Sequence, residues 1–218
     1  MRTKTLLVTA ALTAAGALSS MAQVYSVNIV GYINLTIPTG FSLVATQLNA
    51  TPDNTLATIL PNVAENTTVF KFNGTSYDIS QFSADNPGWS VPTMSLSPGE
   101  GAFVSVDPAF APSGQPVTFV GDVKLVSTVP VPNGFSVASS ALPISDTLDN
   151  LGFPTRENDQ IYFFNNATKS YVIYQFSADN PGWTPGNPTP KIGESFFVSG
   201  DQQFGPPRSW SRTFSVGP

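Results

Sequence analysis

The sequence contains no cysteine and no histidine, and only 11% of its 218 residues are charged. These absences exclude disulfides, thiol nucleophiles, catalytic triads with a histidine base and ordinary zinc sites. The low charge does not indicate disorder, because 41% of the residues are hydrophobic and 16 are phenylalanine. The chain is therefore expected to fold by packing apolar side chains, without covalent cross-links.

Turn-forming residues are abundant, with 20 prolines and 17 glycines between stretches rich in β-branched and aromatic residues. This composition favours short strands joined by tight turns, and hence an all-β protein. The formal net charge of −5 argues against a nucleic-acid partner, which requires patches of lysine and arginine. No glycine-rich dinucleotide or phosphate-loop motif occurs. We therefore expect neither a nucleic-acid partner nor a cofactor.

The first 22 residues are typical of a secretory signal peptide. Arg2 and Lys4 form a positive start, Leu6–Leu18 is an apolar core too short for a membrane helix, and Ser20-Met21-Ala22 suits a signal peptidase. The mature protein is then expected to begin at Gln23, with 7 basic and 14 acidic residues. No second hydrophobic segment follows. We expect a protein that is secreted or held at the cell surface, with no membrane contact after cleavage.

An internal duplication organises the chain. The nine residues Gln81–Trp89 recur letter for letter as Gln175–Trp183, ninety-four positions later. Shorter matches at the same spacing are Gly40-Phe41-Ser42 with Gly134-Phe135-Ser136 and Gly99-Glu100 with Gly193-Glu194. A constant offset over this length indicates a tandem repeat. We expect residues 23–127 and 128–218 to form two similar β-sandwich or small-barrel units, each with one short helix, packed together.

Local patterns predict several elements. Alternating apolar and polar residues predict a long strand over Val24–Ile37, with a bulge or bend at Gly31. Capping residues and apolar spacing predict a helix of at most two turns between Asp53 and Pro61, and a counterpart between Asp146 and Pro154. Asn73-Gly74 predicts a hairpin.

A segment resembling Val-Thr-Phe-Val-Gly occurs near Val27–Gly31, at Val117–Gly121 and at Thr213–Gly217. Three such segments serve two repeats, which leaves the N-terminal strand Val24–Val30 without an obvious place. Two alternatives follow. The strand pairs with another chain and causes self-association, or it pairs with the C-terminal strand of the same molecule.

Three motifs carry a resemblance to a known family. Gly-Phe-Ser-Leu-Val-Ala starts at Gly40, Val-Phe-Lys-Phe-Asn-Gly at Val69, and Pro-Gly-Glu-Gly-Ala-Phe-Val at Pro98. In this order they resemble secreted, duplicated β-rich proteins of unknown function from Verrucomicrobia-type bacteria. The second copy departs from the pattern at Val137, where the pattern has leucine, and at Ser195, where it has glycine. The resemblance implies export and a duplicated β fold, and no particular chemistry.

The repeated nine-residue stretch has two interpretations. An exposed indole beside a carboxylate is typical of sugar stacking, and nearby tyrosines would extend such a site. Alternatively, Asn86-Pro87-Gly88 forms a type II turn and the tryptophan folds back onto the sheet, where its burial stabilises the fold. The candidate ligand-binding residues are Trp89, Trp183, Asp85, Asp179, Tyr77 and Tyr171.

Asp85 with Glu100 and Asp179 with Glu194 are the carboxylate pairs repeated at matching positions. Glycoside hydrolysis requires two facing carboxylates. However, Glu100 lies in the turn Pro98–Gly101, and an enzyme seldom carries two equal active sites in so short a chain. No calcium-loop pattern occurs either. We expect no catalytic or metal site. The leading hypothesis is an exported non-catalytic structural or adhesive protein, and the alternative is a carbohydrate-binding module with an extracellular glycan as its partner.

Overall fold

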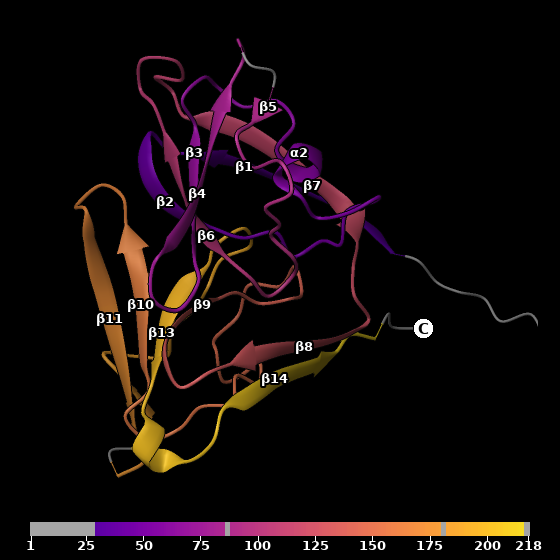
Figure 1. Ribbon diagram of the computed structural model, residues 1–218. Helices are drawn as coiled ribbons and strands as arrows, with labels where there is room; N and C mark the ends of the chain where they lie inside the picture. Colours follow the sequence, from indigo (N-terminus) through magenta and orange to yellow (C-terminus); the bar gives the residue numbers. More distant parts are fainter. Residues whose placement is uncertain (1–28, 86–87, 180–181, 216–218) are drawn as a thin grey trace, which may run out of the picture.

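The computed structural model describes residues 29–85, 88–179 and 182–215, and it confirms an all-β protein with two similar halves (Figure 1). Copy 1 comprises β1 (Val30–Ile37), β2 (Gly40–Val44), α2 (Leu56–Ile59), β3 (Thr68–Phe72), β4 (Tyr77–Ser83), β5 (Gly88–Trp89), β6 (Ala102–Val106) and β7 (Gln115–Asp122). Copy 2 comprises β8 (Val126–Val131), β9 (Gly134–Ala138), β10 (Gln160–Asn165), β11 (Ser170–Ser177), β12 (Gly182–Thr184), β13 (Phe196–Gly200), the 3₁₀ turn η2 (Gln202–Phe204) and β14 (Arg208–Thr213).

Each copy is a two-layer sandwich. The larger layer is a five-stranded antiparallel sheet, in the order β2-β6-β3-β4-β5 in copy 1 and β9-β13-β10-β11-β12 in copy 2. The smaller layer is a two-stranded antiparallel ribbon, β1 with β7 or β8 with β14. The identical strand order follows from the duplication, because equivalent sequences adopt equivalent pairings.

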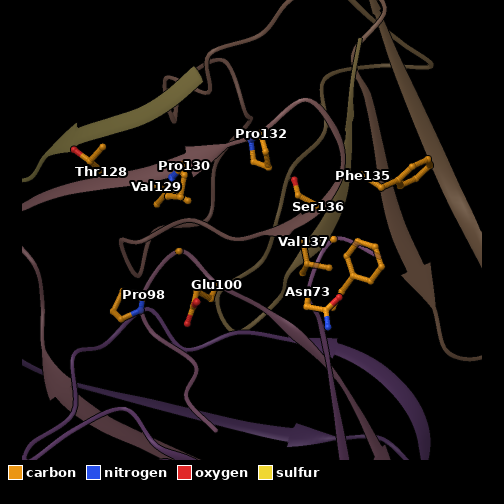
Figure 2. Close-up of a pocket in the computed structure, with 13 residues that line it drawn as sticks. Asn73, Pro98, Glu100, Thr128, Val129, Pro130, Pro132, Phe135, Ser136 and Val137 are labelled. Atoms are coloured by element: carbon orange, nitrogen blue, oxygen red, sulfur yellow. The ribbon is translucent and has the colours of Figure 1, made fainter. Parts of the chain in front are cut away.

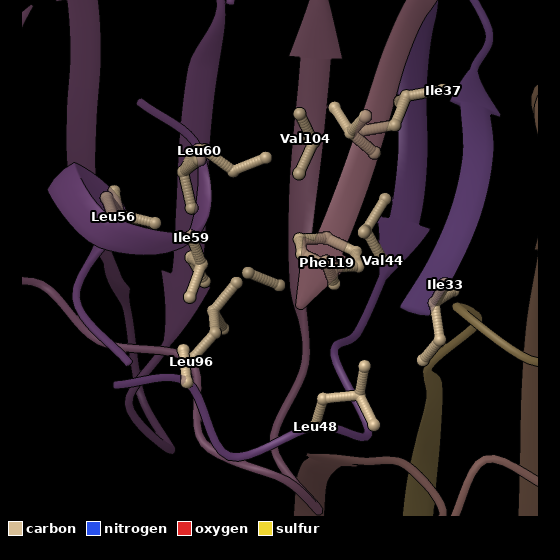
Figure 3. Packing of buried hydrophobic residues seen from close by; sticks show 14 of the residues in the cluster. Ile33, Ile37, Val44, Leu48, Leu56, Ile59, Leu60, Leu96, Val104 and Phe119 are labelled. Atoms are coloured by element: carbon tan, nitrogen blue, oxygen red, sulfur yellow. The ribbon is translucent and has the colours of Figure 1, made fainter. Parts of the chain in front are cut away.

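The core of each copy lies between its sheet and its ribbon. On β1 the side chains alternate, so that Ile33 and Ile37 are buried while Asn34 and Thr36 are exposed, as the sequence predicted. Figure 3 shows Ile33 and Ile37 packing with Phe119 of β7 and with apolar residues of the sheet and α2. In copy 2 the fully buried Trp210 takes a comparable place on the ribbon, and its indole N–H donates to the Leu151 carbonyl at 2.8 Å.

The N-terminal strand pairs inside its own copy. β1 pairs with β7 from Val30 opposite Asp122 to Ile37 opposite Gln115. The predicted pairing with the C-terminal strand is wrong for the described residues, because β14 pairs with β8. The reason is that the middle segment forms two strands, β7 and β8, joined at 123–125, so four ribbon strands serve two copies. Residues 24–28 of the predicted strand lie outside the described residues.

The copies meet earlier in the chain than the sequence indicated. The expected boundary between 127 and 128 falls inside β8, and the structure changes copy at 123–125. Thr128–Asn133, which follows that expected boundary and contains Pro130 and Pro132, includes most of the edge strand β8. Pro130 is tolerated there because the ribbon has only two strands, so one side of β8 needs no ladder hydrogen bonds.

Two further local expectations need correction. Gly31 makes no bulge, because the β1–β7 register is continuous. A Cβ at Gly31 would lie 2.7 Å from Leu48 Cδ2, so the glycine allows close packing instead. The predicted helix of copy 2 is a single hydrogen-bonded turn, Leu151 N–H to the Thr147 carbonyl. It ends at Gly152, whose φ of +64° is left-handed and stops the turn. The predicted Asn73-Gly74 hairpin is confirmed between β3 and β4.

The two copies are related by a pseudo-two-fold axis, because their contacts are reciprocal. The Ala45 N–H donates to the Gly193 carbonyl at 2.9 Å, and Ser139 N–H, ninety-four positions after Ala45, donates to the Gly99 carbonyl at 2.9 Å. Such exchange of equivalent contacts defines an isologous interface. The chain is therefore arranged like a homodimer whose subunits are fused.

Residues that meet their own counterparts mark this pseudo-dyad. Gly101 and Ser195 are equivalent and touch, since a Cβ on Gly101 would overlap the Ser195 side chain. The equivalent rings of Phe103 and Phe197 lie 5.9 Å apart between centroids, and both are buried. Small residues (Gly101 and Ser195) and buried aromatic rings (Phe103 and Phe197) therefore meet at the pseudo-dyad. A further equivalent pair, Tyr77 and Tyr171, is partly exposed to solvent.

Candidate functional site

The candidate site forms where the outer faces of the two five-stranded sheets meet. The inner face of each sheet covers its core, and strand alternation directs the other side chains outward. On β3, Val69 points into the core while Phe70 and Phe72 point outward. The outward side chains of both copies join in a third cluster, built on Leu43, Phe103 and Phe197 and shared between the copies.

The outward positions of both sheets carry no charged side chain, although the chain as a whole is acidic. They form three rows across paired strands of copy 1, starting from the pseudo-dyad. The rows are Phe72 and Tyr77; then Phe70, Ile79, Phe103 and Leu43; then Thr68, Gln81, Ser105 and Phe41. Copy 2 repeats them as Phe164 and Tyr171; then Tyr162, Ile173, Phe197 and Val137; then Gln160, Gln175, Ser199 and Phe135.

An aromatic groove of about 360 Å³ opens between these faces. Its walls are six aromatic side chains, two from copy 1 and four from copy 2: Phe72, Tyr77, Phe135, Tyr162, Tyr171 and Phe197. The rings brace one another at tilted or edge-to-face angles, for example Phe72 with Phe197 at 5.8 Å and Tyr171 with Phe197 at 6.1 Å. Such contacts stabilise the ring positions, so the shape of the groove is maintained by packing among the aromatic side chains that line it.

Tyr77 and Tyr171 are equivalent residues of the two copies, and both line the groove. Both rings remain about two-fifths exposed, at 40% and 42%. Burial raises the pKa of both phenols, and the pKa of Tyr171 is raised further by the charge that Tyr77 would carry when ionised. This coupling is expected for two hydroxyls held close together. The sequence named both tyrosines, and the structure brings them into one site.

The two tryptophans are buried rather than displayed. Trp89 and Trp183 are only 6% and 8% exposed. The indole N–H of Trp89 donates to the Leu60 carbonyl at 2.9 Å, and that of Trp183 donates to Asp149 Oδ1 at 3.1 Å. Neither indole offers a free face for a sugar ring. The sugar-stacking interpretation is therefore wrong for these two residues, because each indole gains more from the core and from its hydrogen bond.

Asp85 and Asp179 are exposed in the loops after β4 and β11, away from the groove. Since a strand advances about 3.3 Å per residue, the end of β4 at Ser83 lies about 20 Å from Tyr77. Asn86 and Pro87 of the predicted type II turn lie outside the described residues. The six candidate residues thus separate into a tyrosine pair in the groove, a tryptophan pair in the cores and an aspartate pair in distant loops.

Two equivalent lateral clefts flank the pseudo-dyad, with volumes of about 300 and 320 Å³. Figure 2 shows the first, where Pro98 and Glu100 of copy 1 lie across from Val129 and Pro130 of copy 2. Each cleft contains one glutamate, Glu100 in the first and Glu194 in the second. Glu100 accepts a charged hydrogen bond from Lys71 Nζ at 2.9 Å.

The two glutamates differ in their electrostatics. Glu194 is a largely buried carboxylate whose Oε2 accepts the Lys191 N–H at 2.9 Å. Burial raises the pKa of Glu194. The hydrogen bond from the Lys191 N–H and the positive charge of the Lys191 side chain lower this pKa, but they offset only part of the effect of burial. Lys71 of copy 1 has the aromatic Phe163 as its counterpart in copy 2, so Glu194 lacks the ammonium that Glu100 contacts.

Replacing Glu194 with glutamine is therefore expected to stabilise the protein at pH 7. The folded state binds the Glu194 proton more tightly than the unfolded state does, so the stability linked to this group is full below its ordinary pKa of 4.5 and is lost as the pH rises. Thermal unfolding of Glu194→Gln should start above that of the wild type at pH 7 and match it near pH 3. Glu100→Gln is the matched control and should not stabilise at pH 7, because it loses the ion pair with Lys71. A gain of the same size in both variants would contradict this account.

Within residues 29–85, 88–179 and 182–215, no group of three or more acidic side chains is placed to hold a metal ion. Over the same part of the chain, no helix is long and apolar enough to cross a membrane. The described carboxylates of the predicted pairs are also not assembled, since Asp85 follows the far end of β4 whereas Glu100 is held in the first lateral cleft.

Four groove residues, Phe72, Phe135, Tyr162 and Phe197, were not singled out from the sequence. A usable signal was present. Strands β3 and β10 place apolar residues on both faces, as in Val69-Phe70-x-Phe72 and Ile161-Tyr162-x-Phe164. A strand that is apolar on both faces needs a second partner layer or displays an aromatic surface. The outer faces of β3 and β10 do both of these things. They pack against the other copy near the pseudo-dyad, and they line the exposed aromatic groove beyond it.

No protein-family model, curated protein or solved structure matches the chain.

Proposed function

We propose that this chain is a non-catalytic adhesive protein of the cell exterior, and that the aromatic groove is its binding surface. The observation that carries the proposal is the Tyr77–Tyr171 pair, because both tyrosines line the groove and remain about two-fifths exposed. Large apolar surfaces on a folded protein are typical of interaction sites, because exposing them to water is unfavourable. The sequence pattern of residues 1–22 supports the location.

The chemistry of the surface supports binding rather than catalysis. The groove walls offer aromatic rings and phenol hydroxyls, without a carboxylate, an amine or a nucleophile activated by a base. The phenols of Tyr77, Tyr162 and Tyr171 have raised pKa values because of burial, so they stay protonated at neutral pH. They are suited to hydrogen bonding and stacking.

Replacing Tyr77 and Tyr171 together with alanine is expected to weaken adhesion at least about tenfold, because two stacking rings are removed. The measurement is retention of the mature protein on a sensor coated with extracellular polymer, compared by dissociation rate. Tyr32→Ala is the matched control, since Tyr32 is 69% exposed on β1, outside the groove. The Tyr77→Phe/Tyr171→Phe double variant should keep most of the retention.

Circular dichroism and thermal unfolding establish that each variant is folded before retention is compared. The proposal fails if the alanine pair retains full adhesion, or if Tyr32→Ala reduces adhesion as much as the pair does.

A further inference from the structure

We infer that the aromatic groove binds an uncharged polysaccharide, whose sugar rings stack on the tyrosines while its hydroxyls bond to amide and hydroxyl side chains beside them. This inference rests on the proposed function, because it names the ligand class of the same surface. It goes further in assigning the polar third row of each sheet as part of the site.

The first support is the absence of charge. The chain carries 14 acidic and 9 basic residues, yet no outward position on the strands that form the groove is charged. An anionic polymer would need arginine or lysine on this surface, and a bound cation is normally offset by a carboxylate as well as by aromatic rings. An uncharged ligand avoids both requirements. The charge pattern therefore selects a neutral partner.

The second support is the polar strip beside the rings. In copy 1, Gln81, Thr68 and Ser105 are direct cross-strand neighbours. In copy 2, Gln175, Gln160 and Ser199 occupy the equivalent places. Each strip lies two residues along the strands from the middle aromatic row, or about 7 Å. Amides and hydroxyls both donate and accept, which matches the hydroxyl groups of a sugar.

The polar strip also connects directly to the groove wall. The hydroxyl of Tyr162 donates to Gln160 Oε1, and the Phe135 ring lies 5.5 Å from the Tyr162 ring. Phe135 is 51% exposed at the end of the copy 2 strip. A ligand that contacts the wall of the groove can therefore reach ring faces and amide groups at once.

Other occupants fit less well. A second copy of the chain would present the same concave groove, and two concave surfaces do not fill each other. An acyl chain would find no use for the phenol hydroxyls and the amide strip, whose desolvation would oppose binding. The groove volume of about 360 Å³ suits a short stretch of a longer polymer.

The test uses the full mature chain with a neutral β-glucan, a xylan and a mannan as probes, and with alginate and chitosan as anionic and cationic comparators. Retention is measured by affinity electrophoresis and calorimetry. Gln81→Met/Gln175→Met keeps the side-chain shape and removes the amides, and it should weaken binding of the neutral polymer about tenfold. Binding of an apolar fluorescent dye in the groove should stay unchanged in that variant. The Tyr77→Ala/Tyr171→Ala pair should lose both.

Each outcome decides between the two proposals. Retention of at least one neutral polymer that weakens in both double variants supports the inference. Retention of chitosan alone, or of no glycan while the groove still mediates adhesion to another surface, overturns the inference and leaves the adhesive function standing. Glycan binding that neither variant weakens overturns the inference by placing the glycan elsewhere. Adhesion that no groove variant changes overturns both.

Discussion

Replacing Arg208 with alanine is expected to lower the free energy of unfolding by about 3–5 kcal/mol, because it leaves a buried charge without its partner. Asp159 is fully buried, and its Oδ1 accepts a hydrogen bond from Arg208 Nη2 at 2.8 Å. Arg208 Nη1 donates to Asp159 Oδ2 as well, so the pair is bidentate. The Asp159 Oδ2 also accepts the Arg156 N–H at 2.7 Å, which ties a loop to the same carboxylate.

Copy 1 offers a matched control for this ion pair, because it has uncharged residues at the two equivalent buried positions. Thr67 and Gln115 take the places of Asp159 and Arg208. The Gln115 amide donates to the Asn62 carbonyl, as Arg208 donates to the equivalent Pro154 carbonyl. The double variant Asp159→Thr/Arg208→Gln should therefore recover most of the stability that Arg208→Ala loses. Urea unfolding followed by tryptophan fluorescence measures both. A loss below about 1 kcal/mol for Arg208→Ala would contradict this account.

Replacing Gly101 with serine is expected to destabilise the protein by about 3 kcal/mol, because the new side chain would occupy the place of Ser195. A Cβ at position 101 would lie 2.2 Å from the Cβ of Ser195. Because a Cβ is bonded directly to the backbone, a change of side-chain rotamer cannot relieve this clash. The exchange variant Gly101→Ser/Ser195→Gly should come back to within about 1 kcal/mol of the wild type, since it places the same two residues in swapped copies. A residual cost is expected because Val137, not leucine, borders position 101.

Comparing Gly101→Ser, Ser195→Gly and the exchange variant separates a clash between the two equivalent positions from the effect of losing a glycine. Ser195→Gly alone removes the hydrogen bond from Ser195 Oγ to the Val44 carbonyl at 3.1 Å, at a cost of about 1 kcal/mol. If Gly101→Ser and the exchange variant were equally unstable, the two positions would not share one space, and the pseudo-dyad would be misplaced.

The duplication and its strands were predictable because they depend on local sequence. The repeated Gln81–Trp89 stretch fixed the offset between copies, and the alternation around Ile33 and Ile37 identified a strand with one buried face. The turn at Asn73-Gly74 depends on two neighbouring residues, and it was predicted correctly. These features need no knowledge of what lies across the molecule.

The groove and the pseudo-dyad depend on which residues of one copy contact which residues of the other. The ninety-four-residue offset shows which positions are equivalent, but it does not show which positions are in contact. Val137 and Ser195, where copy 2 differs from the equivalent Leu43 and Gly101 of copy 1, both lie at this junction. Ser195 is present where Gly101 makes room for it, so the asymmetry of the sequence records the packing of the copies. That connection becomes readable only once the structure places the two positions side by side.

The tryptophans show the opposite limit. A repeated Trp in a polar loop has the same local sequence whether it faces solvent or the core. The partners that decide the matter, the Leu60 carbonyl for Trp89 and Asp149 for Trp183, are 29 and 34 residues away. The tyrosines named beside them proved to be the exposed pair, because Tyr77 and Tyr171 occupy outward positions on β4 and β11.

The central claim is that both copies together form one groove that binds a neutral glycan. A titration of protein labelled at its six tyrosines tests it most directly, with hexasaccharides of the neutral β-glucan, xylan and mannan followed by NMR. The ring signals of Tyr77, Tyr162 and Tyr171 should shift together along one saturation curve, while Tyr32 on the outside of β1 stays unchanged. Shifts confined to one copy, or a shift of Tyr32 without the groove tyrosines, would contradict the claim.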